Sequence, residues 1–508
     1  MKRTVVGAGL GGLTAGALLA KTGDEVHVLE AHDKPGGCAT TFKRFDLEIE
    51  VSLHEIEGLD GHDMKRSVFD ALGVFDAVEF ERSDAFYRYV DPERGLDFVV
   101  PHGTDGFVKG FAEVFPEEEK GVRRFVELVT RVREEMYDWP FLDDPSLSDY
   151  ALAPLRQRTF GRYRKATLGE VLDEVIDNEA CKLALAANLG YYHDDPYELA
   201  FPYFATAQGG YIEGGGYYIH GGSQRLSDHL ARVIEEEGGT VECERLVTDV
   251  QVEDGRATGV VHDKPRTGGD ERTTGADTVV ANAAVPNVAD ELLPEPYSTE
   301  LRDEIQGFEV APSLSTLYVV FEPTPSELGN EHYSTKIAGK RVDSLEDLAD
   351  SMRGSYGSRP ISFVDYGQLD AGLAPEGMSV GVVSTVDHYN AWTGLTDKEY
   401  RRKKERVTEI LLRRLGSVVP GIEDRVEHRE LATPRTIERF TRNPQGTAYG
   451  FAQTPDQSLG DRAVDSPLPN LRFASAWSSP GGGFTGAVLG GTRTAGSLSE
   501  DVKRFIRR

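Results

Sequence analysis

Three glycines and one acid near the N-terminus have the spacing of a nucleotide-binding turn. Gly7, Gly9 and Gly12 follow an apolar run at 4–6, and Glu30 ends a second apolar run eighteen residues after Gly12. In a strand–turn–helix unit, the first glycine permits the tight turn, the second lets the backbone approach a pyrophosphate, and the third lets the helix pack on the strand. We expect the phosphates at the helix N-terminus and Glu30 on the ribose hydroxyls.

Acid–base chemistry is offered by Glu50 and His54, in the segment 46–54. Burial can tune a carboxylate or an imidazole to donate or remove a proton near neutral pH. The alternative is structural, because an isolated histidine beside an apolar segment is more often only hydrogen-bonded.

An aromatic cluster between residues 191 and 218 is the densest in the chain. It is a candidate wall for an apolar binding tunnel, although the same rings could equally form ordinary core. Its members are Tyr191, Tyr192, Tyr197, Phe201, Tyr203, Phe204, Tyr211, Tyr217 and Tyr218.

The elements that must position these residues follow from the hydrophobic patterns. A strand, a helix and a second strand are expected over 4–30, and 122–218 is mostly helical. An amphipathic helix at 224–237 follows Tyr218 to Ser223, Asp254-Gly255 marks a hairpin, and 276–283 reads as a buried strand. β-Branched runs at 313–322 and 378–387 predict strands of a separate sheet, and 400–415 predicts a charged helix. Near the C-terminus, a strand at 471–474 leads through a glycine-rich turn into a helix, which offers a second helix N-terminus to the same cofactor.

Composition limits the class of protein. The 508 residues suffice for two or three domains, and no run of eighteen apolar residues predicts a membrane-spanning helix. A formal net charge of -29 argues against nucleic-acid binding and, as a hypothesis, suits a halophile's cytoplasm, where salt screens self-repulsion. The three scattered cysteines suit a reducing cytosol. The twelve histidines show no paired-ligand spacing, so no metal site is expected.

Together the two terminal regions resemble the carotenoid desaturase, carotenoid isomerase and retinol saturase family of FAD-dependent oxidoreductases. Gly7, Gly9, Gly12, Glu30 and the pair Gly36-Gly37 fit that family's FAD signature, and Pro480 to Ala487 is similar to its C-terminal flavin segment. The stretch 46–54 is similar to the saturase branch, with Ser52 in place of the family's usual glycine.

The resemblance implies an α/β fold with a discontinuous, Rossmann-like, FAD-binding domain of the two-dinucleotide-binding, GG-doublet type, and an α+β substrate-binding domain. We expect 1–100, 215–290 and 430–508 in the FAD-binding domain, and 101–214 and 291–429 in the substrate-binding domain. The implied FAD-binding residues are Gly7, Gly9, Gly12, Glu30, Gly36, Gly37, Val247, Ala281, Asn282, Gly483, Phe484, Thr485 and Gly486, with His54 and Glu50 as the catalytic candidates.

The implied function is FAD-dependent redox chemistry at a carbon–carbon double bond of a polyene or isoprenoid, as a desaturase, saturase or isomerase. The partner is then an apolar substrate, and a cytoplasmic enzyme is expected with peripheral contact on the inner face of the cell membrane. Two alternatives stay open. One is a flavin amine or porphyrinogen-type oxidase, and the other is a non-catalytic prenyl-binding escort protein of the same fold.

Overall fold

The computed structural model describes residues 1–59, 63–140, 142, 145–459 and 463–507. Its first layer is a parallel sheet of five short strands in the order β10-β2-β1-β14-β20. These strands are β10 (Thr240–Glu242), β2 (Glu25–Leu29), β1 (Lys2–Val6), β14 (Thr278–Ala281) and β20 (Leu471–Phe473). The central strand β1 is flanked in register by β2 and β14, so segments far apart in sequence end at one edge of the sheet.

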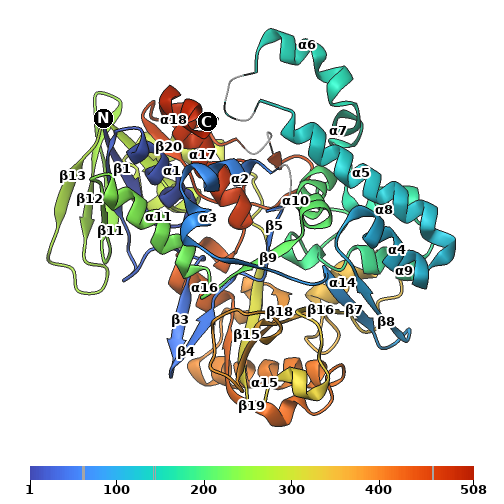
Figure 1. The fold of residues 1–508 in the computed structure, drawn as a ribbon. Coiled ribbons are helices and arrows are strands. Elements are labelled where there is room, and N and C mark those ends of the chain that lie inside the picture. The colour runs from blue at the N-terminus through green and yellow to red at the C-terminus, as the bar shows by residue number, and fades with distance from the viewer. Residues whose placement is uncertain (60–62, 141, 143–144, 460–462, 508) are drawn as a thin grey trace.

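Helix α1 (Leu10–Lys21) packs between α17 (Gly483–Leu498) and α11 (Gln224–Glu236) beside this sheet (Figure 1). Eleven of its residues are buried, which explains why its sequence is apolar and small rather than amphipathic. By contrast, α11 buries only one face, through Leu226, Leu230 and Ile234. Both helices agree with the sequence expectations.

An antiparallel sheet of β11 (Leu246–Glu253), β12 (Arg256–Asp263) and β13 (Arg272–Gly275) lies at the outer side of the parallel sheet. Asp254 and Gly255 form the predicted hairpin turn, both with positive φ (49° and 73°).

The largest sheet has seven strands in the order β19-β15-β18-β17-β16-β7-β8 and lies at the opposite end of the molecule (Figure 1). The predicted strands are β15 (Ser313–Phe321) and β18 (Ser379–Asp387), which pair antiparallel along their full length. The others are β19 (Val426–Ala432), β17 (Ile361–Asp365), β16 (Ser334–Ile337), β7 (Tyr87–Asp91) and β8 (Leu96–Val100), and α15 (Asp397–Gly416) covers the sheet. Strands β7 and β8 join this sheet through β16. Both strands lie within 1–100, which the sequence analysis assigns to the FAD-binding domain.

A helical region lies between 104 and 214, so it begins before the predicted span 122–218, which ends in a strand. Its members are α4 (Thr104–Val114), α5 (Glu119–Tyr137), α6 (Leu147–Arg156), α7 (Arg158–Tyr163), α8 (Leu168–Val175), α9 (Glu179–Leu185) and α10 (Phe201–Gly214). The long helices α5 and α10 pack against each other, and β9 (Gly216–Ile219) then pairs with β5 (Ile56–Glu57) and β6 (Phe80–Arg82).

The remaining helices are α2 (Met64–Ala71), α3 (Val74–Ala77), α12 (Val285–Asn287), α13 (Tyr297–Glu304), α14 (Asp347–Arg353), α16 (Pro434–Thr441) and α18 (Glu500–Ile506), with a hairpin of β3 (Thr41–Arg44) and β4 (Leu47–Glu50). Among the described residues, none of the helices is both long and apolar enough to cross a bilayer. This mixed architecture of a Rossmann-like α/β layer and an α+β region is the fold class expected from the sequence. The numbered domain boundaries stay a prediction.

Candidate active site

The glycine turn lies where β1 ends and α1 begins. Gly7 has a φ of +95°, a conformation that favours glycine, and a Cβ on Gly12 would lie 2.3 Å from the Gly7 carbonyl oxygen. The N-cap of α1 is Gly9, whose lack of a side chain leaves the first-turn amides without a cap. These amides therefore form a cradle for an anion, where the positive end of the helix dipole also favours negative charge.

Asn282, which the sequence analysis gives only as an implied FAD-binding residue, also stabilises this turn. Its amide Nδ2 donates to the Gly7 carbonyl oxygen (3.2 Å), and a Cβ on Gly9 would lie 2.7 Å from the same nitrogen. Gly11, which the sequence analysis did not single out, is equally constrained, because its Cβ would lie 1.7 Å from the Ala474 carbonyl oxygen. Glycine at these positions thus serves contacts with β14 and β20 as well as the approach of a ligand.

Glu30 directly follows β2 and points back to the same turn. Its carboxylate accepts hydrogen bonds from the backbone amides of Ala8 (2.7 Å) and His32 (2.8 Å). Its own backbone is held by strand β10 and by Arg245, whose amide donates to the Glu30 carbonyl oxygen. The carboxylate is therefore fixed beside the amide cradle, at the carboxyl edge of the parallel sheet.

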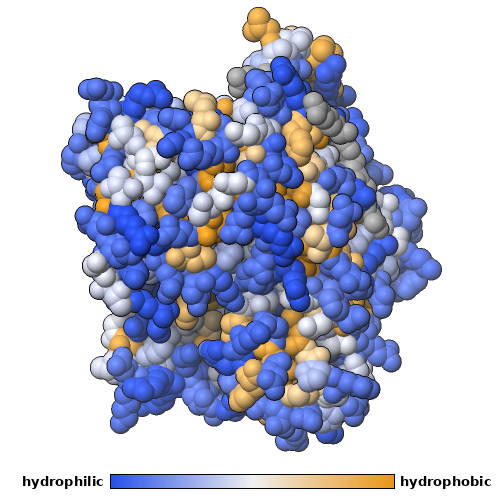
Figure 2. Space-filling view, turned by 60° about the vertical axis from the view of Figure 1, so that its left-hand side comes forward, coloured by the Kyte–Doolittle hydropathy of each residue, from blue (hydrophilic) through white to orange (hydrophobic). Residues whose placement is uncertain are grey.

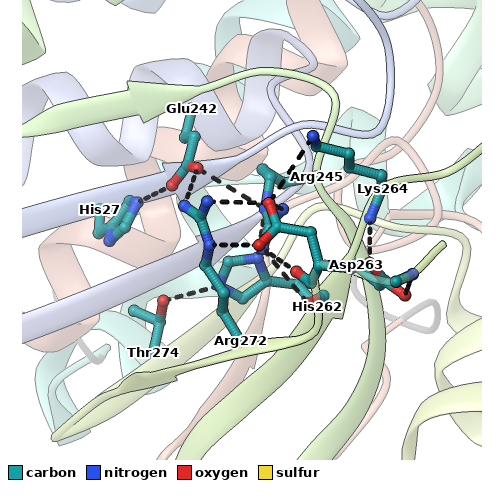
Figure 3. A network of polar contacts seen from close by, with 10 residues as sticks. His27, Glu242, Arg245, His262, Asp263, Lys264, Arg272 and Thr274 are labelled. Atoms are coloured by element: carbon teal, nitrogen blue, oxygen red, sulfur yellow. Dashed lines mark hydrogen bonds and ion pairs between the residues drawn. The ribbon is translucent and has the colours of Figure 1, made fainter. Parts of the chain in front are cut away.

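A network of polar contacts stabilises this edge of the sheet (Figure 3). The buried Arg245 guanidinium donates to His262 Nδ1 (2.7 Å) and to Asp270, while Arg272 bridges Asp270 and Glu242. Burial and the neighbouring Arg245 lower the pKa of His262, which keeps its ring neutral and able to accept from the arginine. The network ties β10 to the antiparallel sheet and so fixes the segment that carries Glu30.

The other predicted nucleotide contacts gather at the same edge. Gly36 and Gly37 have positive φ (128° and 60°), and Gly36 bridges to Gly9. Ala281 ends β14, and Val247 in β11 is buried in the cluster that also contains Ala281. The structure thus brings the Gly36-Gly37 pair to the first glycine turn, and it packs Val247 in the same cluster as Ala281.

The predicted C-terminal segment forms the start of α17. Gly481, Gly482 and Gly483 all have positive φ, and α17 begins at Gly483 with no side-chain cap, followed by Phe484, Thr485 and Gly486. The hydroxyl oxygen of Thr485 is buried and has no hydrogen-bond partner within the described ranges. An uncapped helix start and an unsatisfied buried hydroxyl fit a polar ligand atom at this point.

A cavity of about 160 Å³ lies between this segment and the helical region. One side is formed by 480–486, and the other includes His54, Glu55 and Glu57. Of the nominated aromatic residues, Tyr191, Tyr192, Tyr203 and Tyr211 line the cavity, together with Tyr137 and Tyr449. The other five do not: Phe201, Phe204, Tyr217 and Tyr218 are core residues, and the Tyr197 hydroxyl donates to Asp173.

Glu50 does not line this cavity, which corrects its proposed catalytic position. Its fully buried carboxylate accepts from the amides of Ser52 and Leu53 and from the Ser223 amide, the Ser223 hydroxyl and the Tyr218 hydroxyl. Burial raises its pKa, and the hydrogen bonds from Ser223, Leu53 and Ser52 oppose that rise. Since five donors enclose the carboxylate, its geometry is that of a structural acceptor joining β4 to the start of α11.

His54 does face the cavity, and its ring nitrogen Nδ1 lies 2.8 Å from the Tyr191 hydroxyl. Burial, reinforced by the positive charge of Lys336, lowers the pKa of His54 to about 3, so the ring is neutral at neutral pH. Tyr333 and Tyr366 donate hydroxyl hydrogen bonds to the backbone carbonyls of His54 and Leu53. These contacts fix the segment around the ring.

Comparisons with known proteins show the family of the chain. The sequence profile of the family described as flavin containing amine oxidoreductase matches residues 10–498. All-trans-retinol 13,14-reductase from Danio rerio is 27% identical, over 97% of this chain and 85% of that protein. Prolycopene isomerase 1, chloroplastic, from an Oncidium hybrid cultivar is 25% identical, over 98% of this chain and 84% of that protein.

Solved structures share the fold at low identity. An oxidoreductase from Methanosarcina mazei superposes with a TM-score of 0.62 at 17% identity, covering 97% of this chain and 99% of its own. Putrescine oxidase bound to putrescine gives 0.64 at 15% identity, covering 98% and 99%. With the family profile spanning nearly the whole chain, this protein belongs to the flavin-containing amine oxidoreductase family and is an FAD-dependent oxidoreductase.

Proposed function

We propose that the substrate is an apolar polyene or isoprenoid and that the reaction takes place at one of its carbon–carbon double bonds. The observation that carries this proposal is the cavity lined by six tyrosines beside the 480–486 segment. Aromatic walls suit a ligand that offers no polar handle. The names of the relatives that act on retinol and prolycopene support the same substrate class.

FAD fits the residues at both ends of this site. The first-turn amides of α1 would hold the pyrophosphate, Glu30 the ribose, and the start of α17 with Thr485 the flavin side of the cofactor. When bound, FAD supplies hydride exchange at its ring. The protein's part is then to hold the substrate against that ring, exclude water and handle the proton.

The carboxylates that line the cavity are largely compensated by cations. The Glu57 carboxylate lies 3.5 Å from the ammonium of the buried Lys65, which also pairs with Asp63 at 2.9 Å. Burial raises the pKa of Glu55 to about 7, even with Lys336 nearby. These two carboxylates are nevertheless the feature that would favour the second candidate, an amine oxidase, because a cationic substrate would need such partners.

An apolar substrate must be drawn from a lipid phase, and we propose that a cytoplasmic enzyme meets the membrane surface through α6. This helix buries none of its residues and projects from the molecule (Figures 1 and 2). It exposes Leu147 (90%), Tyr150 (59%) and Leu155 (78%). Since the net charge of -29 opposes anionic lipid, the expected surface is zwitterionic. Flotation with phosphatidylcholine vesicles should be lost in a Leu147→Asp, Leu155→Asp variant, and equal flotation of both proteins would refute the contact.

Incubating the reduced and the oxidised holoprotein separately with polyenes and with primary amines tests the proposed reaction. A polyene product that gains two hydrogens identifies a saturase, one that loses two a desaturase, and one of unchanged mass but altered retention an isomerase. Amine oxidation with no change in any polyene would replace the proposal by the second candidate.

A further inference from the structure

A hydrogen-bonded chain of three side chains crosses the wall between the active-site cavity and a second cavity. We propose that Lys336, Tyr191 and His54 form a proton relay that serves the substrate carbon in the active-site cavity. This inference rests on the proposed function, because it assigns a proton path to that reaction.

The donors and acceptors in this chain fit a relay. Lys336 Nζ donates to the Tyr191 hydroxyl oxygen at 2.8 Å, and this hydroxyl lies 2.8 Å from His54 Nδ1. In the relay arrangement, the Tyr191 oxygen accepts from the Lys336 ammonium, which can only donate, and the Tyr191 proton points to Nδ1. The neutral His54 ring then carries its own proton on Nε2, for which no protein acceptor is found among the described residues. That N–H group belongs to a ring that lines the active-site cavity.

The far end of the chain opens into different surroundings. Lys336 and Tyr191 both line a second cavity of about 50 Å³, bounded by the seven-stranded sheet and α14. Tyr191 lines both cavities, and therefore separates them while its hydroxyl connects Lys336 to His54. Water in the second cavity would reprotonate Lys336 without entering the active-site cavity.

The charges around Lys336 make it a proton donor near neutral pH. Burial lowers its pKa to about 7, against the attraction of Glu55, whose own pKa burial raises to about 7. Ser362 on β17 accepts a second hydrogen bond from Nζ at 3.3 Å. Tyr89 on β7 pairs in register with Lys336, and Arg94 lines the same cavity, where it is held by Asp91. Glu55 is thus the carboxylate that tunes the relay.

The proton and electron balance is complete in the saturating direction. The reduced flavin, when bound, would supply a hydride to one carbon of the double bond, and the π electron pair would move to the other carbon. That carbon takes the His54 Nε2 proton, while the Tyr191 proton moves to Nδ1 and a Lys336 proton moves to the Tyr191 oxygen. The net loss is one proton from Lys336, so no charge is left on His54. Proton exchange after product release returns the ring to its Nε2–H form, and desaturation runs the same path backwards.

The experiment compares the wild-type holoprotein with Tyr191→Phe, Lys336→Met and a control, Tyr333→Phe. Among the described residues, the hydroxyl that the control removes bonds the His54 backbone carbonyl and no side chain of the relay. Two measurements are made on each protein: the ¹⁵N resonances of labelled histidine, without substrate, and polyene turnover against pH at saturating substrate.

We expect wild-type His54 to stay neutral with its proton on Nε2 between about pH 5 and pH 8. In the saturating direction, turnover should fall above pH 7 as Lys336 loses its proton. Tyr191→Phe and Lys336→Met should lower kcat by about ten-fold or more and lose that limb, with KM and flavin content retained. Tyr333→Phe should keep the limb and the His54 resonances, even if it melts earlier.

Retained kcat and pH profile in Tyr191→Phe would overturn the relay and leave the polyene reaction intact. If no polyene is converted at all, the proposed function fails, and the relay fails with it. A His54 proton found on Nδ1 would overturn the relay whatever the substrate is.

Discussion

At the scale of single residues, the recognisable chemistry is the part that lies close together in sequence. Gly7, Gly9, Gly12 and Glu30 were identifiable because the turn and the following strand are built from one continuous segment. Lys336 was not, since it donates to Tyr191, 145 positions away, which only the folded chain brings near. Glu50 shows the opposite error: it lies near His54 in sequence, but β4 ends at Glu50, and the two side chains then have different partners, Ser223 for Glu50 and Tyr191 for His54.

Glu30→Gln should weaken FAD retention. The carboxylate accepts two backbone amides in the structure, and an amide nitrogen would oppose either those donors or the ribose hydroxyls. A hydrogen bond to a charged group contributes about 1.5 to 3 kcal/mol, so the affinity should fall by about ten-fold to a hundred-fold. Flavin titration of the apoprotein measures this. Glu25→Gln, at the exposed start of the same strand, is the control, and equal affinities would remove Glu30 from the cofactor site.

Glu50→Gln should destabilise the fold without affecting the chemistry. A glutamine nitrogen would meet one of five donors with no acceptor, at a cost of about 1 to 3 kcal/mol. Thermal melting should therefore shift downward, whereas Glu48→Gln in the same strand, whose side chain is 32% exposed, should change stability by less than about 0.5 kcal/mol. Turnover per bound flavin should stay normal in both variants, and its loss in Glu50→Gln alone would return Glu50 to the catalytic candidates.

At the scale of elements, the strands and helices with clear periodicity appear where the sequence predicts them. Periodicity does not, however, predict which sheet a strand joins or which helices pack together. Strand β7 reads as an ordinary strand, but whether it joins the five-stranded or the seven-stranded sheet depends on β16, some 245 residues later. The same holds for helices: α1 and α17 come from opposite ends of the chain and pack through glycines. A Cβ on Gly491 would lie 2.2 Å from the Gly11 carbonyl oxygen.

Gly491→Ala should therefore separate α1 from α17 and loosen both helix starts that we assign to FAD. The clash is with backbone, which cannot rotate away as a side chain can, so we expect a cost of about 1 to 3 kcal/mol and reduced flavin occupancy. Gly496→Ala is the matched control in the same helix, because its nearest neighbour is a leucine carbon at 3.4 Å. Melting temperature and flavin absorbance of both proteins decide the matter: equal occupancy would mean that the packing of α17 does not support the cofactor site.

At the scale of the whole molecule, the fold class and the cofactor followed from the two ends of the chain, because the segments that we assign to FAD are the first glycine turn and the start of α17. The substrate does not follow in the same way, since the cavity wall is assembled from α5, α10, the 52–57 segment and the C-terminal turn. Composition does give a prediction at this scale, because the chain has 85 acidic and 56 basic residues.

That excess predicts a fold whose stability depends on salt. Self-repulsion of a net charge of -29 acts over a Debye length of about 10 Å at 0.1 M salt, but over only about 3 Å at 1 M. Melting temperature should therefore rise steeply as KCl is raised from dilute buffer, and the gain should flatten once the charges are screened. Sucrose, which stabilises by exclusion from the surface without screening, is the control and should give no such flattening. An equal melting temperature in dilute buffer and in molar KCl would contradict the hypothesis of a saline cytoplasm. The acidic surface would then serve solubility alone.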